Sequence, residues 1–511
     1  MKKVVTLTLL IIFGSLLIMS HQLNKNSNNS LRVAFPSFNR GIDYDPVSIH
    51  LAYEYIFLEN IYSPLVEISP KDGGITEGVA SKMSWHGDDL HLEIRENMKT
   101  ASGRSITADD VIFSLKRLLI LSGNTHGNFE DLVCPGVKLK DVEDNCPGIS
   151  KKGNTVILSA SKRKSFLLPM LGAIDFAVIP KHAVDPKTLK IVDYSETSGP
   201  YYVKSATDGR IQLAANPNHY HFSKEIASSV ELIPFDRSKA NAALQLFENN
   251  VVDHIMTTNS TPIEDLITYA RQHKDTTNLH VTMNIRNIIL VFTERGIKEI
   301  SQSERENIGR GIKSQFTDIY HGKPGYDPSF DFFSSLADGG LSQSQQETIS
   351  HKYQDQPVQN STSFDIALLK SGDITLWKNA VKKIAPNANC IQDIRIPDLS
   401  TYNNNEKIPH AFIIATDSSY FEDISLISYS LNAGYFGLTK EKRKEWLAHY
   451  MGLESKTDRL ALLRQLHFEF LNDAVLVPLV ISPFVALATK KWTMELSQLY
   501  ANNQLWLLKH Q

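Results

Sequence analysis

The sequence predicts a mixed α/β protein with more than one domain. Segments that alternate apolar and polar residues, as half-buried strands do, are interspersed with segments whose apolar residues recur at helical spacing. Mixing of this kind throughout a chain is typical of α/β or α+β architecture. The chain has 511 residues, of which 42% are hydrophobic, and this is enough for a large core divided between domains.

The first half of the chain predicts strands with helices between them. Thr107 is the expected N-cap of one helix, because Asp109 and Asp110 follow in the first turn, where carboxylates favour the helix dipole. Strands 201–203 and 211–213 are expected to form a hairpin. The other segments of this half are predicted as strands at 31–35, 90–95, 154–160, 174–179 and 251–255, and as helices at 48–59 and 240–247.

The second half predicts a further group of strands and a long amphipathic helix. The helix is expected at 458–471, where apolar residues recur at helical spacing. Residues 296–359 are polar and predict helical or irregular structure. The strands of this half are expected at 364–369, 411–415, 475–479 and 484–488.

Composition and motifs exclude several functional classes. The net charge is -3 and charged residues make up 21% of the chain, so we expect no nucleic-acid partner and no binding to anionic lipid. The sequence lacks a phosphate-binding glycine loop and a Gly-x-Ser-x-Gly nucleophile motif. It therefore predicts no enzymatic activity and no cofactor.

Two clusters of metal-ligating residue types do not predict a metal site. Asp109 and Asp110 are adjacent on a helix and point about 100° apart, since a turn takes about 3.6 residues. His219 and His221 would share one face of a strand, but no third ligand follows nearby. We interpret the two histidines as residues at the surface of a turn or a strand.

The N-terminus predicts export. Lys2 and Lys3 precede an apolar run at 4–19, and a polar stretch follows. The run is shorter than the roughly 20 residues of a membrane span and fits the core of a secretory signal. A poor cleavage site leaves two alternatives for residues 1–22, a signal peptide or an N-terminal anchor formed by 4–19. The absence of a cysteine after the run argues against a lipoprotein.

Export makes a disulfide permissible. The chain has three cysteines. Cys134 and Cys146 bracket a short polar loop in which each cysteine is followed by Pro-Gly, so closure is sterically easy. We favour a Cys134–Cys146 disulfide over three unrelated thiols, since exported proteins tend to oxidise such pairs. Cys390 would then be unpaired.

Several segments, in order, resemble one known family. The most specific is 106–117, which follows the strand at 90–95 through a turn at Gly103. The others are 45–46, 59–66, 78–85, 198–204, 215–220, 240–253 and 459–479. Together they resemble the family 5 extracellular solute-binding proteins, which include the oligopeptide- and dipeptide-binding receptors of ABC importers. The resemblance is weakest from 296 to 409.

The resemblance implies a two-lobed periplasmic-binding-protein (Venus-flytrap) fold with an extra subdomain in the first lobe. Two chain segments would cross between the lobes, near Thr282 and near Asp473. The implied division is 31–58, 178–282 and 474–511 for the first lobe, 59–177 for its extra subdomain, and 283–473 for the second lobe.

The resemblance also implies a function. A monomer in the periplasm would capture a peptide, or a similar small solute, between its lobes and deliver it to the membrane subunits of an ABC importer. The ligand would stabilise the closed state because it contacts both lobes.

The resemblance implies a ligand site at the end of the strand 411–415. Asp417 matches the aspartate that holds the peptide amino group in oligopeptide receptors, and Ala415 and Thr416 precede it. The alternative is a plain loop aspartate that caps the next turn. Two departures weaken the peptide interpretation. Ile414 replaces the family's tryptophan, and residues 480–482 replace its tyrosines.

These departures favour an alternative function, that of an orphan receptor with the same fold for a non-peptide solute or a signal. An intracellular regulator with this fold would need a DNA-binding segment ahead of residue 31, where the export signal lies. A hydrolase would need a nucleophile constellation, which the sequence does not contain.

Overall fold

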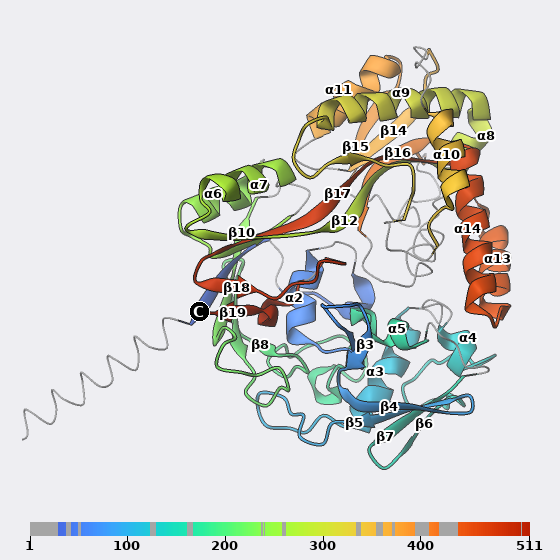
Figure 1. The fold of residues 1–511 in the computed structure, drawn as a ribbon. Helices are drawn as coiled ribbons and strands as arrows, with labels where there is room; N and C mark the ends of the chain where they lie inside the picture. Colours follow the sequence, from blue (N-terminus) through green and yellow to red (C-terminus); the bar gives the residue numbers. More distant parts are fainter. Residues whose placement is uncertain are drawn as a thin grey trace, which may run out of the picture.

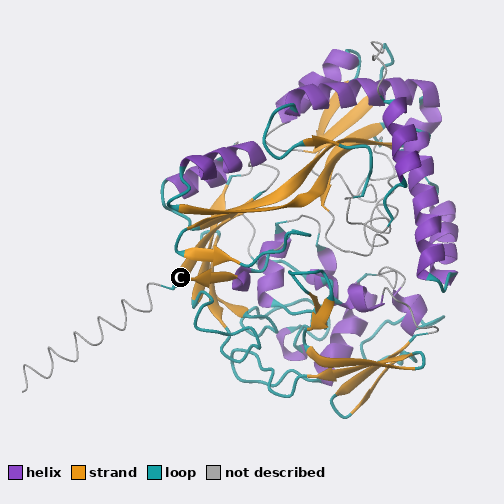
Figure 2. Cartoon of the chain, viewed as in Figure 1, coloured by secondary structure: helices purple, strands orange, loops and turns teal. Residues whose placement is uncertain are grey.

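Two long strands run through both halves of the molecule in the computed structural model (Figure 1). They are β12 (Thr277–Phe292) and β17 (Leu476–Thr489), and they pair antiparallel from Thr277–Thr489 to Val291–Leu476. They lie in the middle of an 11-stranded sheet with the order β15-β14-β16-β12-β17-β11-β1-β10-β9-β8, to which β13 is added beside β17. The strands on the two sides of this pair belong to two lobes (Figure 2).

The structure describes residues 29–36, 42–49, 53–122, 129–160, 167–236, 239, 241–257, 262–333, 339–353, 361–369, 374–393, 408–417, 438–501 and 503–511. The expected signal or anchor, residues 1–22, lies outside them. Within the described ranges, none of the helices is long and apolar enough to cross a membrane.

The first lobe is built on strands β1, β8–β11 and the first half of β12. β1 pairs parallel with β10, and β8 and β9 form the predicted hairpin, with Asp208 and Gly209 at positive φ in its turn. The elements of this lobe are β1 (Ser30–Pro36), η1 (Pro46–Ser48), α2 (Glu54–Ile61), η3 (Lys181–Ala183), β8 (Tyr201–Thr207), β9 (Arg210–Ala215), β10 (Ser229–Phe235), α6 (Ala242–Glu248), β11 (His254–Met256), α7 (Ile263–Gln272), β18 (Trp492–Met494), η6 (Leu505–Leu507) and β19 (Leu508–His510).

A subdomain with its own core extends from the first lobe. It contains an antiparallel sheet in the order β4-β5-β7-β6, and its core is formed by buried residues between Leu65 and Val178. Its elements are β2 (Val66–Ile68), β3 (Ile75–Glu77), β4 (Ala80–His86), β5 (Asp89–Ile94), α3 (Ala108–Leu121), α4 (Phe129–Val133), β6 (Ile149–Lys152), β7 (Thr155–Ser159), α5 (Leu167–Leu171) and η2 (Ile174–Phe176).

Local sequence signals in the subdomain produce the structures they predict, with one exception. Thr107 is the N-cap of α3, and its N–H donates to Asp110 Oδ2 at 2.9 Å in a capping box. The strand predicted at 174–179 is wrong. The Ala177 N–H bonds to Ile174 O and closes a 3-10 turn, and the Val178 N–H donates to Ser63 O instead of joining a ladder.

The two cysteines of the subdomain are joined. A disulfide connects Cys134, directly after α4, to Cys146, and their Cα atoms are 5.0 Å apart. Both cysteines are buried in the subdomain core, where Cys146 precedes β6. Cys390 lies half-buried in β15 and is unpaired.

The second lobe has parallel strands β14, β15 and β16, and β16 pairs antiparallel with the second half of β12. α9 lies across β17, and a Cβ on Gly311 would come within 2.4 Å of Ile384, so the close approach of α9 and α11 requires glycine there. The elements are α8 (Glu294–Glu299), α9 (Gln302–Tyr320), β13 (Asp327–Pro328), α10 (Gln343–Lys352), β14 (Asp365–Leu369), α11 (Ile374–Ile384), β15 (Asn389–Asp393), β16 (Ala411–Asp417), α13 (Lys440–Gly452) and α14 (Lys456–Asn472).

The lobe boundary at the C-terminal side requires correction. The sequence assigned 474–511 to the first lobe, with the second crossing near Asp473. In the structure, Val475 to Val480 pack in the core of the second lobe, and the two expected strands at 475–479 and 484–488 are the single strand β17. We therefore place the crossing near Ser482. The apolar pattern does not show this boundary, because β17 is buried in both lobes.

A buried ion pair joins the subdomain to the rest of the first lobe. Arg117 of α3 is 1% exposed, and its guanidinium binds both carboxylate oxygens of Asp45, the N-cap residue of η1. Its Nε also donates to Leu189 O at 2.8 Å. Leu189 has a φ of 57°, an unfavourable value for a branched side chain, so Arg117 holds a strained residue in place.

Arg117→Met is expected to lower the free energy of unfolding by about 3 kcal/mol, since the change leaves Asp45 without a counterion and Leu189 O without a donor. Urea unfolding followed by circular dichroism measures the loss. Lys82→Met is the matched control, because the Lys82–Glu93 pair is exposed and is worth at most about 1 kcal/mol. Equal losses in both variants would contradict a special role for Arg117.

Candidate ligand-binding site

The parallel strands of the second lobe end where the chain crosses between the lobes. β14, β15 and β16 run in the same direction, so their carboxyl ends lie at one edge of the sheet, where α/β proteins commonly bind ligands. β16 continues beyond the end of β14 as far as Asp417. The predicted residues Ala415, Thr416 and Asp417 therefore form the last three positions of β16.

Strand pairing places Asp417 beside an arginine. Asp417 stands opposite Arg286 of β12, and Arg286 stands opposite Ser482 of β17, so the three residues form a row across three strands. Arg286 is 8% exposed and Ser482 is 1% exposed. Ala415 packs against the core of the second lobe, so it offers a ligand mainly its backbone. The side chains of Thr416 and Asp417 lie outside the described part of the structure.

The ladder between β12 and β17 is irregular at this crossing. The register shifts between Val281 and Arg286, and Pro483, which has no N–H to donate, occupies the facing position in β17. The Phe484 N–H donates to the Thr282 hydroxyl, with the two heavy atoms 2.8 Å apart, so a side chain replaces a backbone carbonyl as the acceptor. An irregular ladder between two rigid lobes is the expected site of bending.

A buried lysine supports a second irregularity, in the half of β17 that belongs to the second lobe. Ile288 pairs with Val480 and Ile289 pairs with Pro478, which leaves Leu479 as the extra residue of a bulge. Lys313 of α9 is 4% exposed, and its Nζ donates to Pro478 O at 2.7 Å, to Leu479 O at 3.4 Å and to Ser329 O. Burial lowers the pKa of Lys313 to about 7.

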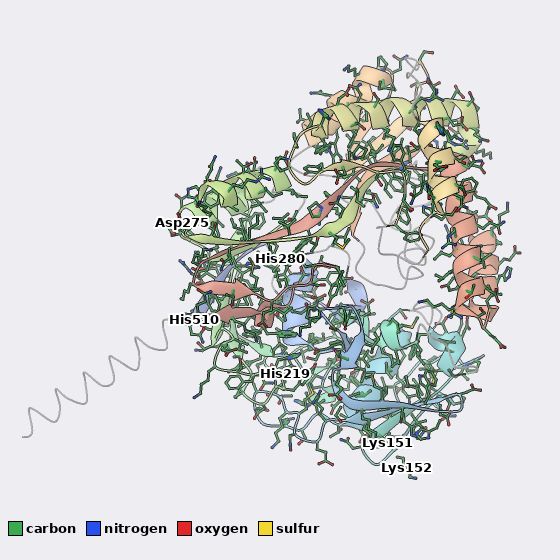
Figure 3. All side chains as sticks on the ribbon, in the orientation of Figure 1. Lys151, Lys152, His219, Asp275, His280 and His510 are labelled. Atoms are coloured by element: carbon green, nitrogen blue, oxygen red, sulfur yellow. A yellow bond between two sulfur atoms is a disulfide. The ribbon has the colours of Figure 1, made fainter. Side chains whose placement is uncertain are left out.

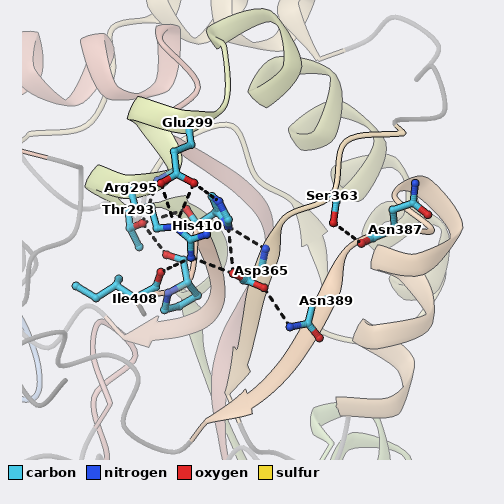
Figure 4. Close-up of polar contacts among 11 residues, drawn as sticks. Thr293, Arg295, Glu299, Ser363, Asp365, Asn387, Asn389, Ile408 and His410 are labelled. Carbon is cyan, nitrogen blue, oxygen red and sulfur yellow. Dashed lines mark hydrogen bonds and ion pairs between the residues drawn. The ribbon is translucent and has the colours of Figure 1, made fainter. Parts of the chain in front are cut away.

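The opposite ends of the parallel strands are joined by a separate polar cluster, which Figure 4 shows. Asp365 at the start of β14 binds Arg295 at 2.9 Å and accepts from Asn389 at 3.0 Å. His410, just before β16, accepts the Asp365 N–H and lies 2.9 Å from Glu299. All of these groups are satisfied within the cluster, so we assign it to holding the strand starts together.

The two histidines considered as metal ligands have other partners. His219 lies in the first lobe, away from the crossing strands (Figure 3), and His221 belongs to the same turn. His219 is 4% exposed, which corrects the expectation of a surface residue. Its Nδ1 accepts the His221 N–H, so its Nε2 carries the proton and donates to Ser63 Oγ at 2.9 Å. His221 Nε2 lies 2.9 Å from both oxygens of Glu67.

A comparison with protein families finds one similarity. The model of "Bacterial extracellular solute-binding proteins, family 5 Middle" matches residues 74–296. Over these residues the chain is similar to this family. The matched residues include most of the subdomain and the whole of β12, and they end before β16. The family match therefore covers Arg286 and does not reach Asp417.

Known proteins share parts of the sequence or the whole fold. The peptidoglycan-binding protein YepA of Agrobacterium fabrum is 24% identical over 212 residues, which cover 40% of this chain and 31% of that protein. The periplasmic oligopeptide-binding protein OppAIV of Borrelia burgdorferi superposes with a TM-score of 0.75 at 16% identity, covering 94% of this chain and 100% of the other. AgaA of A. tumefaciens R10, in complex with agropinic acid, gives 0.72 at 14% identity and covers 94% and 99%.

These matches confirm the family resemblance and the two-lobed fold class predicted from the sequence. The matched family model and the similar structures are those of binding proteins. The sequence did not identify Arg286 and Lys313 as residues of the crossing. Arg286 could have been noticed as a single arginine within the apolar strand 285–292. Lys313 lies in a polar helix, where a lysine gives no signal in the sequence.

The titration of Lys313 predicts a rise in stability with pH. Its folded pKa lies below that of an unfolded lysine, so the unfolded state binds more protons between the two values. The free energy of unfolding should rise from pH 7 to pH 9 by at most about 2–3 kcal/mol. This is an upper limit, because the three carbonyl acceptors favour the charged ammonium and so reduce the difference between the folded and unfolded pKa.

Urea unfolding of the wild type and of Lys313→Met at several pH values tests this prediction. The wild type should gain stability as the pH rises, and the variant should lose most of that slope, because the methionine does not titrate. A slope of the same size in both proteins would contradict the assignment to Lys313.

Proposed function

We propose that the chain is an exported receptor that captures a peptide between its two lobes and delivers it to the membrane subunits of an ABC importer. The observation that carries the proposal is the row of Asp417, Arg286 and Ser482 at the point where both lobes share their strands. The structural similarity to an oligopeptide-binding protein supports a peptide as the ligand. The receptor acts as a monomer in the periplasm, without a cofactor and without covalent chemistry.

The end of β16 supplies the groups that a peptide amino terminus needs. Asp417 binds the terminal ammonium through charge-assisted hydrogen bonds, which are roughly twice as strong as neutral ones. Ala415 and Thr416 offer backbone N–H and C=O groups to the peptide main chain, as in recognition by strand addition. Arg286 stands opposite Asp417 in the strand register, so it adds a positive charge to this end of the site.

Capture follows from the way the lobes are connected. A ligand that touches both lobes favours the arrangement in which both sets of contacts are made, by the difference in its affinity for the open and closed states. Bending at Thr282–Arg286 of β12 and at Ser482–Pro483 of β17 allows the lobes to move as rigid bodies.

A second candidate is a receptor for a non-peptide solute. By the family resemblance, Ile414 stands where oligopeptide receptors carry a tryptophan, and Val480, Ile481 and Ser482 stand where they carry tyrosines. The aromatic residues of a peptide site are therefore absent at these positions. A protein of the same fold binds agropinic acid. The curated relative is described as peptidoglycan-binding, which extends the candidate peptides to those of the cell wall.

Asp417→Asn should weaken the binding of peptides with a free amino terminus by well over tenfold. In the proposed complex the change removes the charged partner of the peptide ammonium, and the loss of one partner of such a pair costs about 2–5 kcal/mol when the pair is enclosed by both lobes. N-acetylated peptides should bind the wild type poorly for the same reason. Isothermal titration calorimetry measures both effects with ordinary tripeptides, their acetylated forms, a peptidoglycan tripeptide and agropinic acid.

Asp365→Asn is the matched control. It removes a carboxylate at the opposite end of the same sheet, so it should lower the melting temperature and leave peptide affinity unchanged. Equal affinity for acetylated and free peptides would refute the role of Asp417. Binding of agropinic acid without binding of any peptide would favour the second candidate.

A further inference from the structure

The segment that follows α9 reaches from the second lobe to a helix of the first. Lys323 Nζ lies 2.8 Å from Oε1 of Glu264, which is in the first turn of α7. The side chains are 34% and 18% exposed, so the pair is only partly solvated. α7 packs in a core with β1, β10 and β17 residues of the first lobe, whereas α9 packs in the core of the second. The ion pair therefore connects the lobes outside the crossing strands.

Two neighbouring residues of the same segment make apolar contacts with α7. Gly325 has a φ of +87°, and a Cβ at this position would lie 2.9 Å from Ile263 Cγ2 and 3.2 Å from Ile267 Cδ1. Tyr326 packs against the cores of both lobes, and its ring centroid is 4.3 Å from that of Tyr320 at the end of α9. The contact between the lobes thus combines an ion pair with close packing.

The rest of the segment is fixed to the second lobe and to the crossing strands. β13 pairs with Ile481 and Val480 of β17, and Asp327 accepts from Asn284 of β12 at 2.7 Å. Asn287 of β12 donates to Phe332 O at 2.8 Å. Residues 321–333 are therefore attached to the crossing along their length, and their first part extends to the first lobe.

We propose that residues 321–333 form a hinge latch, a third and noncovalent link that stabilises the lobe arrangement of this structure. A rotation of the lobes that moves α7 away from α9 must break the Lys323–Glu264 pair and the packing around Gly325. The latch then favours the lobe arrangement of this structure by the free energy of the contacts that it makes only in this arrangement. Its effect on ligand affinity rests on the proposed function, but its effect on lobe separation does not.

Single-molecule energy transfer in ligand-free protein tests the latch. One dye is attached at Lys152→Cys, at the tip of the subdomain (Figure 3), and the other at Lys378→Cys, on α11. Cys390 is replaced by alanine because it is the free thiol, whereas Cys134 and Cys146 are joined in a disulfide. Lys323→Glu places a like charge beside Glu264 and should shift the distribution of transfer efficiency away from that of the wild type. The exchange Lys323→Glu with Glu264→Lys should restore it. Lys82→Glu, whose partner Glu93 lies within the subdomain, should leave it unchanged.

An unchanged distribution in Lys323→Glu, or a double variant that behaves like the single one, would overturn the latch. Where a peptide binds, Lys323→Glu should also change its affinity by about threefold to tenfold. If the transfer efficiency shifts in Lys323→Glu but no peptide is found to bind the protein, the result would support the latch and count against the proposed function. Normal peptide binding with no shift in efficiency would refute the latch alone.

Discussion

The antiparallel ladder between β12 and β17 is the constraint on which the rest of the structure depends. Each strand belongs to the sheets of both lobes, so the position of one lobe relative to the other is set by two backbone segments and the hydrogen bonds between them. Between the lobes the ladder is irregular, because Pro483 removes a donor and the Thr282 hydroxyl replaces a backbone partner, whereas the bulge at Leu479 within the second lobe is held by Lys313. Rigid lobes and a deformable crossing thus arise in the same pair of strands.

Buried polar side chains fix the parts that must not move. Arg117 holds the subdomain to the first lobe, and Lys313 satisfies the carbonyl groups of the bulge in β17. In the second lobe, the two ends of the parallel strands β14, β15 and β16 differ in function. The cluster around Asp365 and His410 is internally satisfied and holds the strand starts, whereas the end at Asp417 faces the crossing and carries the proposed ligand contact.

Features that depend on neighbouring residues could be predicted from the sequence. The capping box of Thr107 and Asp110 and the β8–β9 hairpin are both set by local chemistry, and they formed as expected. The position of Asp417 at a strand end also followed, since β16 is a short apolar run with a polar end.

Features that depend on pairing between distant segments could not be predicted. Arg286 becomes part of the candidate site only because the register places it opposite Asp417, and the register is set by strands more than a hundred residues apart. The crossing in β17 was misplaced because both halves of that strand are apolar and buried. His219 was expected at the surface because its partner, Ser63, is remote in sequence.

Small-angle X-ray scattering of the ligand-free protein and of the protein saturated with a ligand confirmed by calorimetry tests the central claim most directly. If the lobes close about β12 and β17, the radius of gyration must fall when the ligand binds. An unchanged radius of gyration with the ligand bound would show that binding does not bring the lobes together, and it would contradict this account of capture.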